Sequence, residues 1–447
     1  MKKILIKNAQ VVNENTISTK DILIQNQHIE KIENQLDSLP GNVIEIDASN
    51  LYLLPGIIDD QVHFREPGLT HKGTIYTEAK SGVAGGVTTY MEMPNTKPPT
   101  LTQTLLADKY QIASQQSLAN YSFYMGTSND NYDDIMRTDF STVCGLKIFM
   151  GSSTGNLLVD DEHVLSRLFA NVPALIATHC EDEETIKRNL ATAKEQFGED
   201  IPVSQHPIIR NTEACYLSSQ KAIHLAQKHN TRLHILHIST QKECESFSNK
   251  IPLTEKRITA EACIHHLWFN DSAYLTKGNY IKWNPAIKTE ADRLAIWEAL
   301  LDNRIDIIAT DHAPHTIEEK NNKNYTDIPS GGPLLQHSLQ AMLQFYHQGK
   351  ISLERIVEKM CHAPAQCFQI KDRGFIREGY FADLCLVDIH KEMTISKDTI
   401  LCKSGWSPFE ENVMKGQVIR TFVSGHPVYE NGQFDESVKG QRITFTR

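Results

Sequence analysis

The chain has 447 residues, with 45 Lys and Arg against 55 Asp and Glu, so its formal net charge is −10 with His neutral. Its content of 40% hydrophobic and 22% charged residues is typical of a folded globular protein and excludes wholesale disorder. The acidic excess without basic clusters argues against nucleic acid or an anionic membrane as the main partner. No stretch approaches the roughly 18 apolar residues of a membrane span. Nine scattered cysteines without a CxxC pair are typical of reduced thiols, so we expect a cytoplasmic protein.

Both ends of the chain are predicted to form short β-strands. Strand-like runs lie at 3–6, 11–12, 21–24 and 43–46 near the N-terminus, and at 382–387, 418–423 and 427–429 near the C-terminus. Turns are expected at Gly425 and at Asn431-Gly432. We therefore expect the two ends to pair into one small sheet domain.

Between the two ends, short apolar runs alternate with amphipathic stretches. The apolar runs lie at 51–62, 87–93, 121–125, 145–150, 174–177, 232–236, 258–263 and 305–309, and helical periodicity is found at 161–170, 213–229, 290–301 and 334–348. This alternation predicts an α/β fold with a parallel sheet, and eight repeats is the number that closes a (β/α)8 barrel. An open doubly wound sheet is the alternative, but no GxGxxG motif follows any run. The most polar stretch, 318–327, is predicted to be an exposed or mobile loop.

Residues that can bind a metal or a substrate stand at the ends of most of these runs. They are Gln61, His63, Arg65, Asn95, Lys147, His179, His237, Asp311 and His315. In a barrel such positions meet at the C-terminal rim, where these folds carry their active sites. Three imidazoles and a carboxylate from separate strands are ligand types that Zn²⁺ prefers. A lone histidine at a strand end is more often structural, but several together predict a metal centre.

Strand parity helps to choose among the histidines. Residues three apart on a strand point to opposite faces, so only one of His234 and His237 can face the barrel interior. His237 is nearer the end of its run and is the predicted ligand, whereas His234 is expected to pack outward. The adjacent His265 and His266 follow the seventh run, where a polar loop and a functional role are both open. Five others are expected on the surface: His163, His206, His224, His229 and His347.

Lys147 lies within an apolar run, where burying an ammonium group is costly. A buried lysine tends to become neutral, and a neutral amine can react with CO₂ to give a carbamate. The carbamate is a carboxylate on a long arm that can bridge two metal ions. The alternative is a lysine that extends to the barrel rim and keeps its charge in solvent.

Several longer motifs surround these residues. They are Pro55-Gly56-Ile57-Ile58-Asp59, His63-Phe64-Arg65-Glu66-Pro67-Gly68, Met93-Pro94-Asn95-Thr96, Gly145-Leu146-Lys147, Asn284-Pro285 and Asp311-His312-Ala313-Pro314-His315. With these motifs the sequence resembles the dihydroorotase family of the amidohydrolase superfamily over essentially the whole chain. The resemblance implies a TIM-type (β/α)8 barrel at residues 55–370, with a small β-sandwich built from residues 1–54 and 371–447.

The resemblance also implies a role for each site residue. His63 and Asp311 would bind one Zn²⁺, His179 and His237 would bind another, and Lys147, carboxylated on its side-chain nitrogen, would bridge them, with one or two metal ions per subunit. Arg65, Asn95 and His315 would hold the substrate carboxylate, and Asn284 would contact the pyrimidine ring. The implied reaction is the reversible hydrolysis of dihydroorotate to N-carbamoyl-L-aspartate in pyrimidine (UMP) biosynthesis, by metal-activated hydroxide with Asp311 as general base and then acid.

The sequence departs from the superfamily at Gln61, because the usual His-x-His pair here begins with Gln. A glutamine carbonyl is a weaker zinc ligand than an imidazole, so Gln61 is only a candidate ligand and the first metal site is expected to be weakened, labile or empty. Two alternatives stay open: another cyclic amidohydrolase, such as a hydantoinase or allantoinase, and a non-catalytic dihydroorotase-like partner of aspartate transcarbamoylase. The expected partners are a small-molecule substrate and a second copy of the chain in a homodimer.

Overall fold

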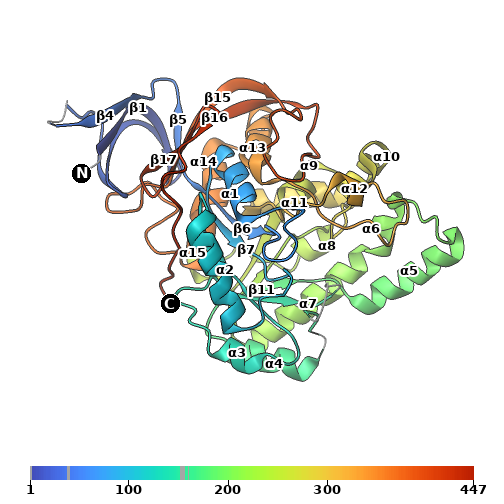
Figure 1. Ribbon diagram of the computed structural model, residues 1–447. Helices are drawn as coiled ribbons and strands as arrows, with labels where there is room; N and C mark the ends of the chain where they lie inside the picture. The colour runs from blue at the N-terminus through green and yellow to red at the C-terminus, as the bar shows by residue number, and fades with distance from the viewer. Residues whose placement is uncertain (1–2, 38–40, 152–156, 160) are drawn as a thin grey trace.

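The computed structural model describes residues 3–37, 41–151, 157–159 and 161–447. A nine-stranded sheet combines both ends of the chain. Its strands are β1 (Lys3–Asn13), β2 (Thr16–Gln25), β3 (His28–Glu33), β4 (Val43–Asp47), β5 (Tyr52–Pro55), β15 (Leu384–Thr394), β16 (Val413–Val423), β17 (His426–Glu430) and β18 (Gln433–Phe434). The order is β18-β17-β16-β15-β5-β1-β2-β3, with β4 paired to β1, so the antiparallel pair β5–β15 joins the two halves. Figure 1 shows β1 and β5, in blue, beside β15 and β16, in red. The predicted pairing of the two ends is confirmed.

Local sequence signals account for the hairpins of this sheet. Ser424 and Gly425 have φ values of 46° and 75°, and Asn431 and Gly432 have 45° and 86°. Positive φ at both central residues is the requirement of a two-residue hairpin turn, which Asn-Gly pairs meet with little strain. The runs at 3–6 and 11–12 are not separate strands, because β1 continues through a shift in register after Ile6.

Eight parallel strands form the barrel among the described residues. They are β6 (Ile57–Val62), β7 (Val87–Glu92), β8 with β9 (Asn120–Phe123 and Met125–Gly126), β10 (Leu146–Phe149), β11 (Ile176–His179), β12 (Leu233–Ile235), β13 (Ile258–Cys263) and β14 (Ile307–Ala309). β6–β8 and β9–β14 are two hydrogen-bonded sets, and a parallel bridge between Val62 and His312 closes the ring. Each of the eight predicted apolar runs overlaps one of these strands, which confirms the barrel.

Helices lie between successive barrel strands and after the last of them, β14, and the longer ones cover the outside of the ring (Figure 1). They are α1 (Ile75–Ala84), α2 (Gln103–Gln116), α3 (Tyr132–Met136), α4 (Glu162–Asn171), α5 (Glu183–Phe197), α6 (His206–Ile209), α7 (Thr212–His229), α8 (Gln241–Cys244), α9 (Ile264–Trp268), α10 (Tyr274–Lys277), α11 (Glu290–Leu301), α12 (Ile317–Lys320), α13 (Ser338–His347), α14 (Leu353–Val357) and α15 (Ala363–Phe368). Side-chain caps fix several starts: Thr74 accepts from Thr77 N before α1, and Thr289 from Asp292 N before α11. Each such cap contributes about 1 kcal/mol. The four predicted helical stretches overlap α4, α7, α11 and α13.

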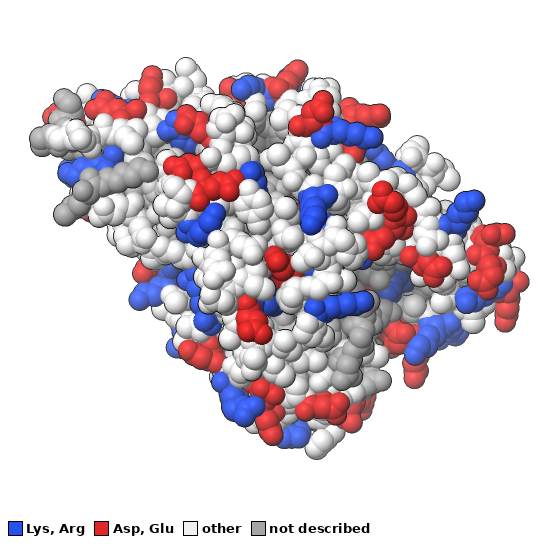
Figure 2. Space-filling view, in the orientation of Figure 1, with Lys and Arg blue, Asp and Glu red and all other residues white. Residues whose placement is uncertain are grey.

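The surface carries mixed charges. Figure 2 shows Lys and Arg interspersed with Asp and Glu over the face in view. Among the described residues, no helix combines the length and the apolar character needed to cross a membrane.

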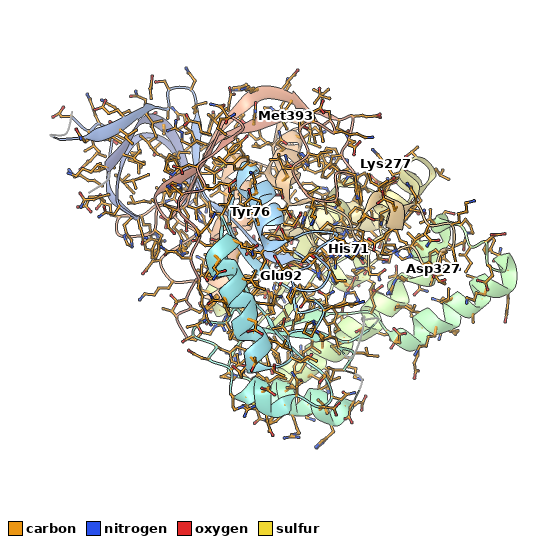
Figure 3. All side chains as sticks on the ribbon, viewed as in Figure 1. His71, Tyr76, Glu92, Lys277, Asp327 and Met393 are labelled. Carbon is orange, nitrogen blue, oxygen red and sulfur yellow. The ribbon has the colours of Figure 1, made fainter. Side chains whose placement is uncertain are left out.

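The polar stretch 318–327 is largely exposed, as predicted, but Lys320 and Tyr325 are buried and anchor it to the rest of the protein. Lys320 in α12 is fully buried, and its ammonium group donates to the carbonyl oxygens of Lys282, Pro329 and Gly331 at 3.3, 3.0 and 3.0 Å. Three carbonyl acceptors replace water around this charge. Asp327, labelled in Figure 3, ends the stretch. Local composition could not reveal acceptors that come from other segments.

His206 provides a correction, since it is buried rather than on the surface. It is 1% exposed, its Nδ1 lies 2.7 Å from Tyr325 Oη, and its Nε2 lies 2.6 Å from Trp283 O. Since a backbone carbonyl only accepts, Nε2 carries the proton and Nδ1 accepts from the tyrosine hydroxyl. His206 thereby ties the polar stretch to the loop that carries Trp283.

Candidate active site

A cavity of about 330 Å³ lies at the C-terminal ends of the barrel strands. Every site residue predicted from the sequence lines it: Gln61, His63, Arg65, Asn95, Lys147, His179, His237, Asn284, Asp311 and His315. The parallel register explains the convergence, because it places Phe149 beside His179 where β10 and β11 end. These ten residues therefore bring four imidazoles, a carboxylate, a lysine, an arginine and three side-chain amides into one cavity.

The first pair of potential metal donors joins β6 to the end of β14. His63 Nε2 lies 3.1 Å from Asp311 Oδ1, and His63 Nδ1 lies 2.7 Å from Asn95 Oδ1. Since a side-chain carbonyl only accepts, Nδ1 carries the proton and Nε2 directs its lone pair toward the carboxylate. Burial lowers the pKa of His63, which favours the neutral ring. An imidazole nitrogen and a carboxylate oxygen placed in this way are suitable ligands for Zn²⁺.

The second pair lies across the rim, where His179 Nδ1 and His237 Nε2 are 3.0 Å apart. His179 Nε2 lies 3.0 Å from Glu181 Oε2, an ion-pair distance that favours the proton on Nε2 and leaves Nδ1 free to bind a metal. Burial lowers the pKa of both rings, and their proximity lowers that of His237 further. Two neutral imidazoles facing each other form a second donor pair.

Lys147 reaches the cavity from β10 and is only 1% exposed. Burial lowers the pKa of its amine to about 7, so a large fraction is neutral near pH 7. Its Nζ lies 4.6 Å from the centre of the Phe149 ring. The buried alternative therefore describes Lys147 better than a lysine that extends into solvent, and the amine has the protonation needed to react with CO₂.

One end of the cavity has a net positive charge, from Arg65, Lys72 and Lys97 against Glu319, which pairs with Lys72 at 2.9 Å. Arg65 Nη2 lies 3.0 Å from His315 Nε2, Arg65 Nε donates to Pro314 O at 3.0 Å, and Lys72 Nζ donates to His315 Nδ1 at 3.0 Å. Lys97 lines the same cavity. Burial and the neighbouring Arg65 hold the pKa of His315 well below its usual value. Cationic donors around a neutral imidazole favour an anionic group of a ligand, such as a carboxylate.

Asn284 is connected to the second donor pair through two residues that the sequence analysis missed. Its Oδ1 accepts from Arg210 Nε at 2.7 Å, and Arg210 Nη1 lies 3.2 Å from Glu181 Oε2. Burial alone would raise the pKa of Glu181, but Arg210 and His179 reverse this and lower it to about 2. Glu181 follows His179 by two residues, so strand alternation could have indicated it. Arg210 lies in a loop after α6, where no strand alternation could have indicated it. Lys72, which lines the cavity, also has no such sequence signal.

The structure corrects the orientation expected for His234. Parity predicts that it packs outward, but its Nε2 lies 3.2 Å from Glu261 Oε2 and 3.4 Å from Asp60 Oδ2. β6 and β12 are not neighbours, so Asp60 and His234 can meet only across the barrel interior. Parity fails here because β12 ends at Ile235, and His237, with φ of 39°, lies beyond the regular strand.

The two histidines left open by the sequence support the cavity wall. His265 stacks on Trp283 with ring centroids 4.6 Å apart, and His266 Nε2 donates to Pro285 O at 3.2 Å. Both are buried and neither lines the cavity. They hold the segment that carries Asn284.

Comparisons with known proteins agree with this geometry. A model of the amidohydrolase family matches residues 52–428, which include every site residue named above. A dihydroorotase from Pyrococcus abyssi is 33% identical over 404 residues, covering 90% of this chain and 89% of the relative. A dihydroorotase from Listeria welshimeri is 31% identical over 437 residues, covering 96% of this chain and 99% of the relative. The solved structure of L-hydantoinase (dihydropyrimidinase) from Arthrobacter aurescens has a TM-score of 0.93 at 26% identity, covering 99% of this chain and 100% of that one. The chain therefore belongs to the amidohydrolase family.

Proposed function

We propose that this cyclic amidohydrolase is a dihydroorotase, which reversibly hydrolyses (S)-dihydroorotate to N-carbamoyl-L-aspartate in de novo pyrimidine biosynthesis. The observation that carries the proposal is the cationic end of the cavity, where Arg65 contacts His315 at 3.0 Å. Dihydroorotate carries a carboxylate beside a cyclic amide, so this end suits the carboxylate while the ring amide faces the histidine pairs. Relatives named dihydroorotase, at 33% and 31% identity, support this substrate.

The donor pairs fit one or two divalent metal ions. His63 with Asp311 would hold one ion and His179 with His237 another, with Lys147, as a carbamate, between them. Each pair combines a nitrogen that is unprotonated at neutral pH with a second ligand atom 3.0–3.1 Å away. A bound Zn²⁺ would supply Lewis-acid polarisation of the ring carbonyl and would acidify water.

The side chains of the chain itself orient the substrate and move the proton. The Arg65 guanidinium offers a forked donor to the substrate carboxylate, and Asn95 and His315 complete this contact. Asn284 contacts the ring. Asp311 takes a proton from the attacking water and returns it to the departing ring nitrogen, so one carboxylate acts as base and then as acid.

The direct test is an assay of purified enzyme loaded with Zn²⁺, comparing dihydroorotate, hydantoin and allantoin. We expect the highest kcat/KM for dihydroorotate. Faster turnover of hydantoin would favour the second candidate, a hydantoinase, which the structural similarity to an L-hydantoinase supports. Absence of turnover together with little bound metal would favour the non-catalytic partner of aspartate transcarbamoylase.

The assembly and location of the enzyme stay predictions. We propose a homodimer in the cytoplasm, with a sandwich at residues 1–54 and 371–447 and a barrel at 55–370. Light scattering on the purified protein tests the dimer, and mixing with aspartate transcarbamoylase tests the association with that enzyme.

A further inference from the structure

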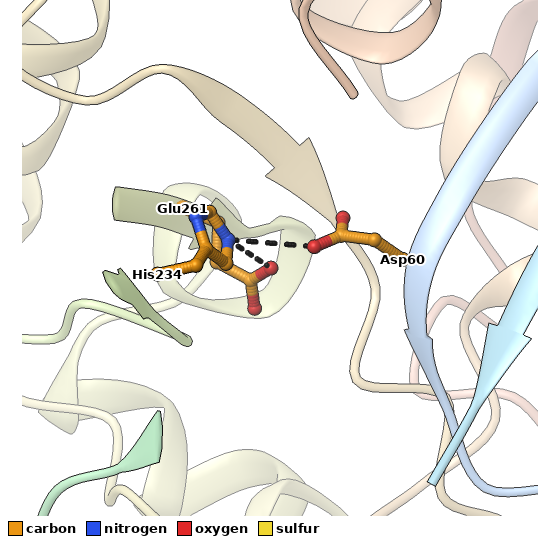
Figure 4. A group of neighbouring side chains, drawn as sticks. All are labelled: Asp60, His234 and Glu261. Atoms are coloured by element: carbon orange, nitrogen blue, oxygen red, sulfur yellow. Dashed lines mark hydrogen bonds and ion pairs between the residues drawn. The ribbon is translucent and has the colours of Figure 1, made fainter. Parts of the chain in front are cut away.

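A second group of side chains able to bind a metal lies inside the barrel, below the cavity. Asp60 of β6, His234 of β12 and Glu261 of β13 are each 0% exposed, and one ligand atom of each lies within 4.8 Å of the other two. Figure 4 shows the imidazole of His234 facing both carboxylates. None of the three lines the cavity, so this group is distinct from the two donor pairs.

One layer of side chains separates this group from the cavity. Cys263 Sγ lies 3.6 Å from Gln61 Oε1, which is in the cavity wall, and 3.6 Å from Glu261 Oε1, which belongs to the group. Glu261 Oε1 also accepts from His237 N at 3.0 Å. The group is therefore in contact with the backbone of one predicted ligand of the cavity.

Hydrogen bonding places a proton on Nδ1 of His234. The Thr259 hydroxyl donates to Leu233 O at 3.2 Å, so its oxygen is free to accept from His234 Nδ1, which lies 2.8 Å away. With one proton on Nδ1, the proton on Nε2, which faces Glu261 Oε2 at 3.2 Å, is the one that a metal ion would displace. A hydroxyl behind one nitrogen and ligand oxygens before the other is the usual arrangement of a histidine that binds a metal.

Among the described residues, only His234 offers positive charge to the two carboxylates. Burial alone would lower the pKa of its ring, but the contacts with Asp60 and Glu261 raise it well above its usual value, and burial raises the pKa of Glu261. Neither forms an ion pair with a Lys or Arg of the described residues; their ion-pair contacts run only to His234. Both oxygens of Asp60 are buried without a hydrogen-bond partner. A buried carboxylate that lost His234 as its partner would cost several kcal/mol. A divalent cation that displaces the Nε2 proton of His234 would neutralise both carboxylates and leave the imidazole neutral.

We propose that Asp60, His234 and Glu261 bind a divalent transition-metal ion, for which we take Zn²⁺ as the probe, at a site inside the barrel. The spacing fits this ion, because tetrahedral ligands at Zn²⁺ bond lengths lie about 3.3 Å apart. His234 Nε2 lies 3.2 Å from Glu261 Oε2 and 3.4 Å from Asp60 Oδ2. The ion would stabilise the barrel and, through Glu261, hold the backbone at His237. The proposal rests on this geometry and does not depend on the substrate of the cavity.

Anomalous diffraction at the zinc absorption edge tests the site in the wild-type protein, without any substitution. We expect a peak about 2.0–2.2 Å from His234 Nε2 and from one oxygen of each carboxylate. Peaks confined to the cavity, with only protons balancing the buried group, would overturn the proposal.

Metal content provides a second test with a matched control. We expect Asp60→Asn, after removal of metal and reloading with Zn²⁺, to hold one equivalent less than the wild type and to gain less in melting temperature from Zn²⁺. The control is Asp21→Asn, a buried carboxylate of the terminal sheet that accepts from the backbone of Asn8 and Leu36. Its zinc content should match the wild type. Equal zinc in Asp60→Asn and the wild type would also overturn the proposal, and if Asp60→Asn does not fold, the diffraction experiment decides alone.

Discussion

Gln61 Nε2 donates to Asp311 Oδ1 at 3.2 Å, at the position where the superfamily usually has a metal-binding histidine. Gln61 Oε1 faces the other way, 3.6 Å from Cys263 Sγ. An amide NH₂ group has no lone pair for a metal, so Gln61 in this orientation competes with a metal for Asp311 instead of sharing in its binding. The first donor pair is therefore left with His63 and Asp311 alone beside Lys147.

Replacing the amide by an imidazole should strengthen this site. We expect Gln61→His to tighten Zn²⁺ binding in the cavity by at least about tenfold, because a nitrogen ligand replaces a competing donor. Competition with a chromophoric chelator measures the affinity. Gln61→Asn is the matched control, since it keeps the amide and cannot reach as far. An unchanged affinity in Gln61→His would show that the native site is already complete.

Asp311 is predicted to transfer the proton, so removing its charge should affect turnover more than binding. We expect Asp311→Asn to lower kcat by about 10²–10⁴-fold. The dissociation constant of dihydroorotate, measured by calorimetry, should change little, because Arg65 and His315, and not Asp311, hold the substrate carboxylate. Near-normal turnover in a folded variant would refute the role of Asp311.

The placement of the predicted site residues could be read from the sequence because the barrel encodes it locally. Each apolar run forms one strand, and the C-terminal ends of parallel strands meet at one rim, so His63, His179 and Asp311 converge although they are far apart in the chain. The terminal sheet was predictable for a similar reason, since Gly425 and Asn431-Gly432 mark its hairpins.

Contacts that depend on tertiary structure could not be predicted. Arg210 reaches Glu181 and Asn284 from a loop without periodicity. Lys320 is buried among the carbonyl groups of Lys282, Pro329 and Gly331, although its sequence neighbours are polar. The orientation of His234 depends on where β12 ends. Because this strand has only three residues, the alternation of side chains along it does not extend to His237.

The buried amine of Lys147 predicts a pH dependence of carbamate formation. Its pKa of about 7 lies below the ordinary value, so the neutral, reactive form increases as the pH rises through 7 and is lost below it. After incubation with ¹³C-bicarbonate and Zn²⁺, we expect a stronger carbamate signal in the ¹³C NMR spectrum at about pH 8 than at about pH 6. Lys147→Arg, which stays charged, is the control and should give no signal. A signal of equal strength in that variant would assign the carbamate to another amine.

The Arg65 guanidinium is predicted to select for a carboxylate. We expect Arg65→Gln to raise KM for dihydroorotate by about 10–100-fold, because a charge-assisted forked contact is lost. The KM of Arg65→Lys should lie between those of the wild type and Arg65→Gln, since lysine keeps the positive charge but lacks the forked pair of donors. Leu69→Ala, at another position in the cavity wall, is the control for altered packing. Equal KM values in Arg65→Gln and the wild type would place the substrate carboxylate elsewhere.

The buried ion pair between Lys109 of α2 and Glu92 of β7 is predicted to stabilise the cavity wall. Both side chains are 1% exposed, Lys109 Nζ also donates to Met93 O at 3.1 Å, and Glu92 Oε1 accepts from Phe64 N, next to His63, at 3.2 Å. Figure 3 labels Glu92. Because Lys109→Met leaves a buried carboxylate unpaired, we expect it to destabilise the barrel by about 3–5 kcal/mol, seen as a lower melting temperature.

The sign of the pH effect distinguishes this cause from lost packing. Burial raises the pKa of Glu92 even beside Lys109, and removing Lys109 should raise it further. A carboxyl whose pKa is raised on folding favours the folded state at low pH, and this contribution is lost as the pH rises through the folded-state pKa. The melting temperature of Lys109→Met should therefore approach that of the wild type as the pH falls toward about 5. The double variant Lys109→Met/Glu92→Gln carries no charge at this position. Its melting temperature should be lowered less, and the difference from the wild type should not depend on pH. If Lys109→Met lowers the melting temperature by the same amount at every pH, the lysine stabilises the wall by packing and not by charge.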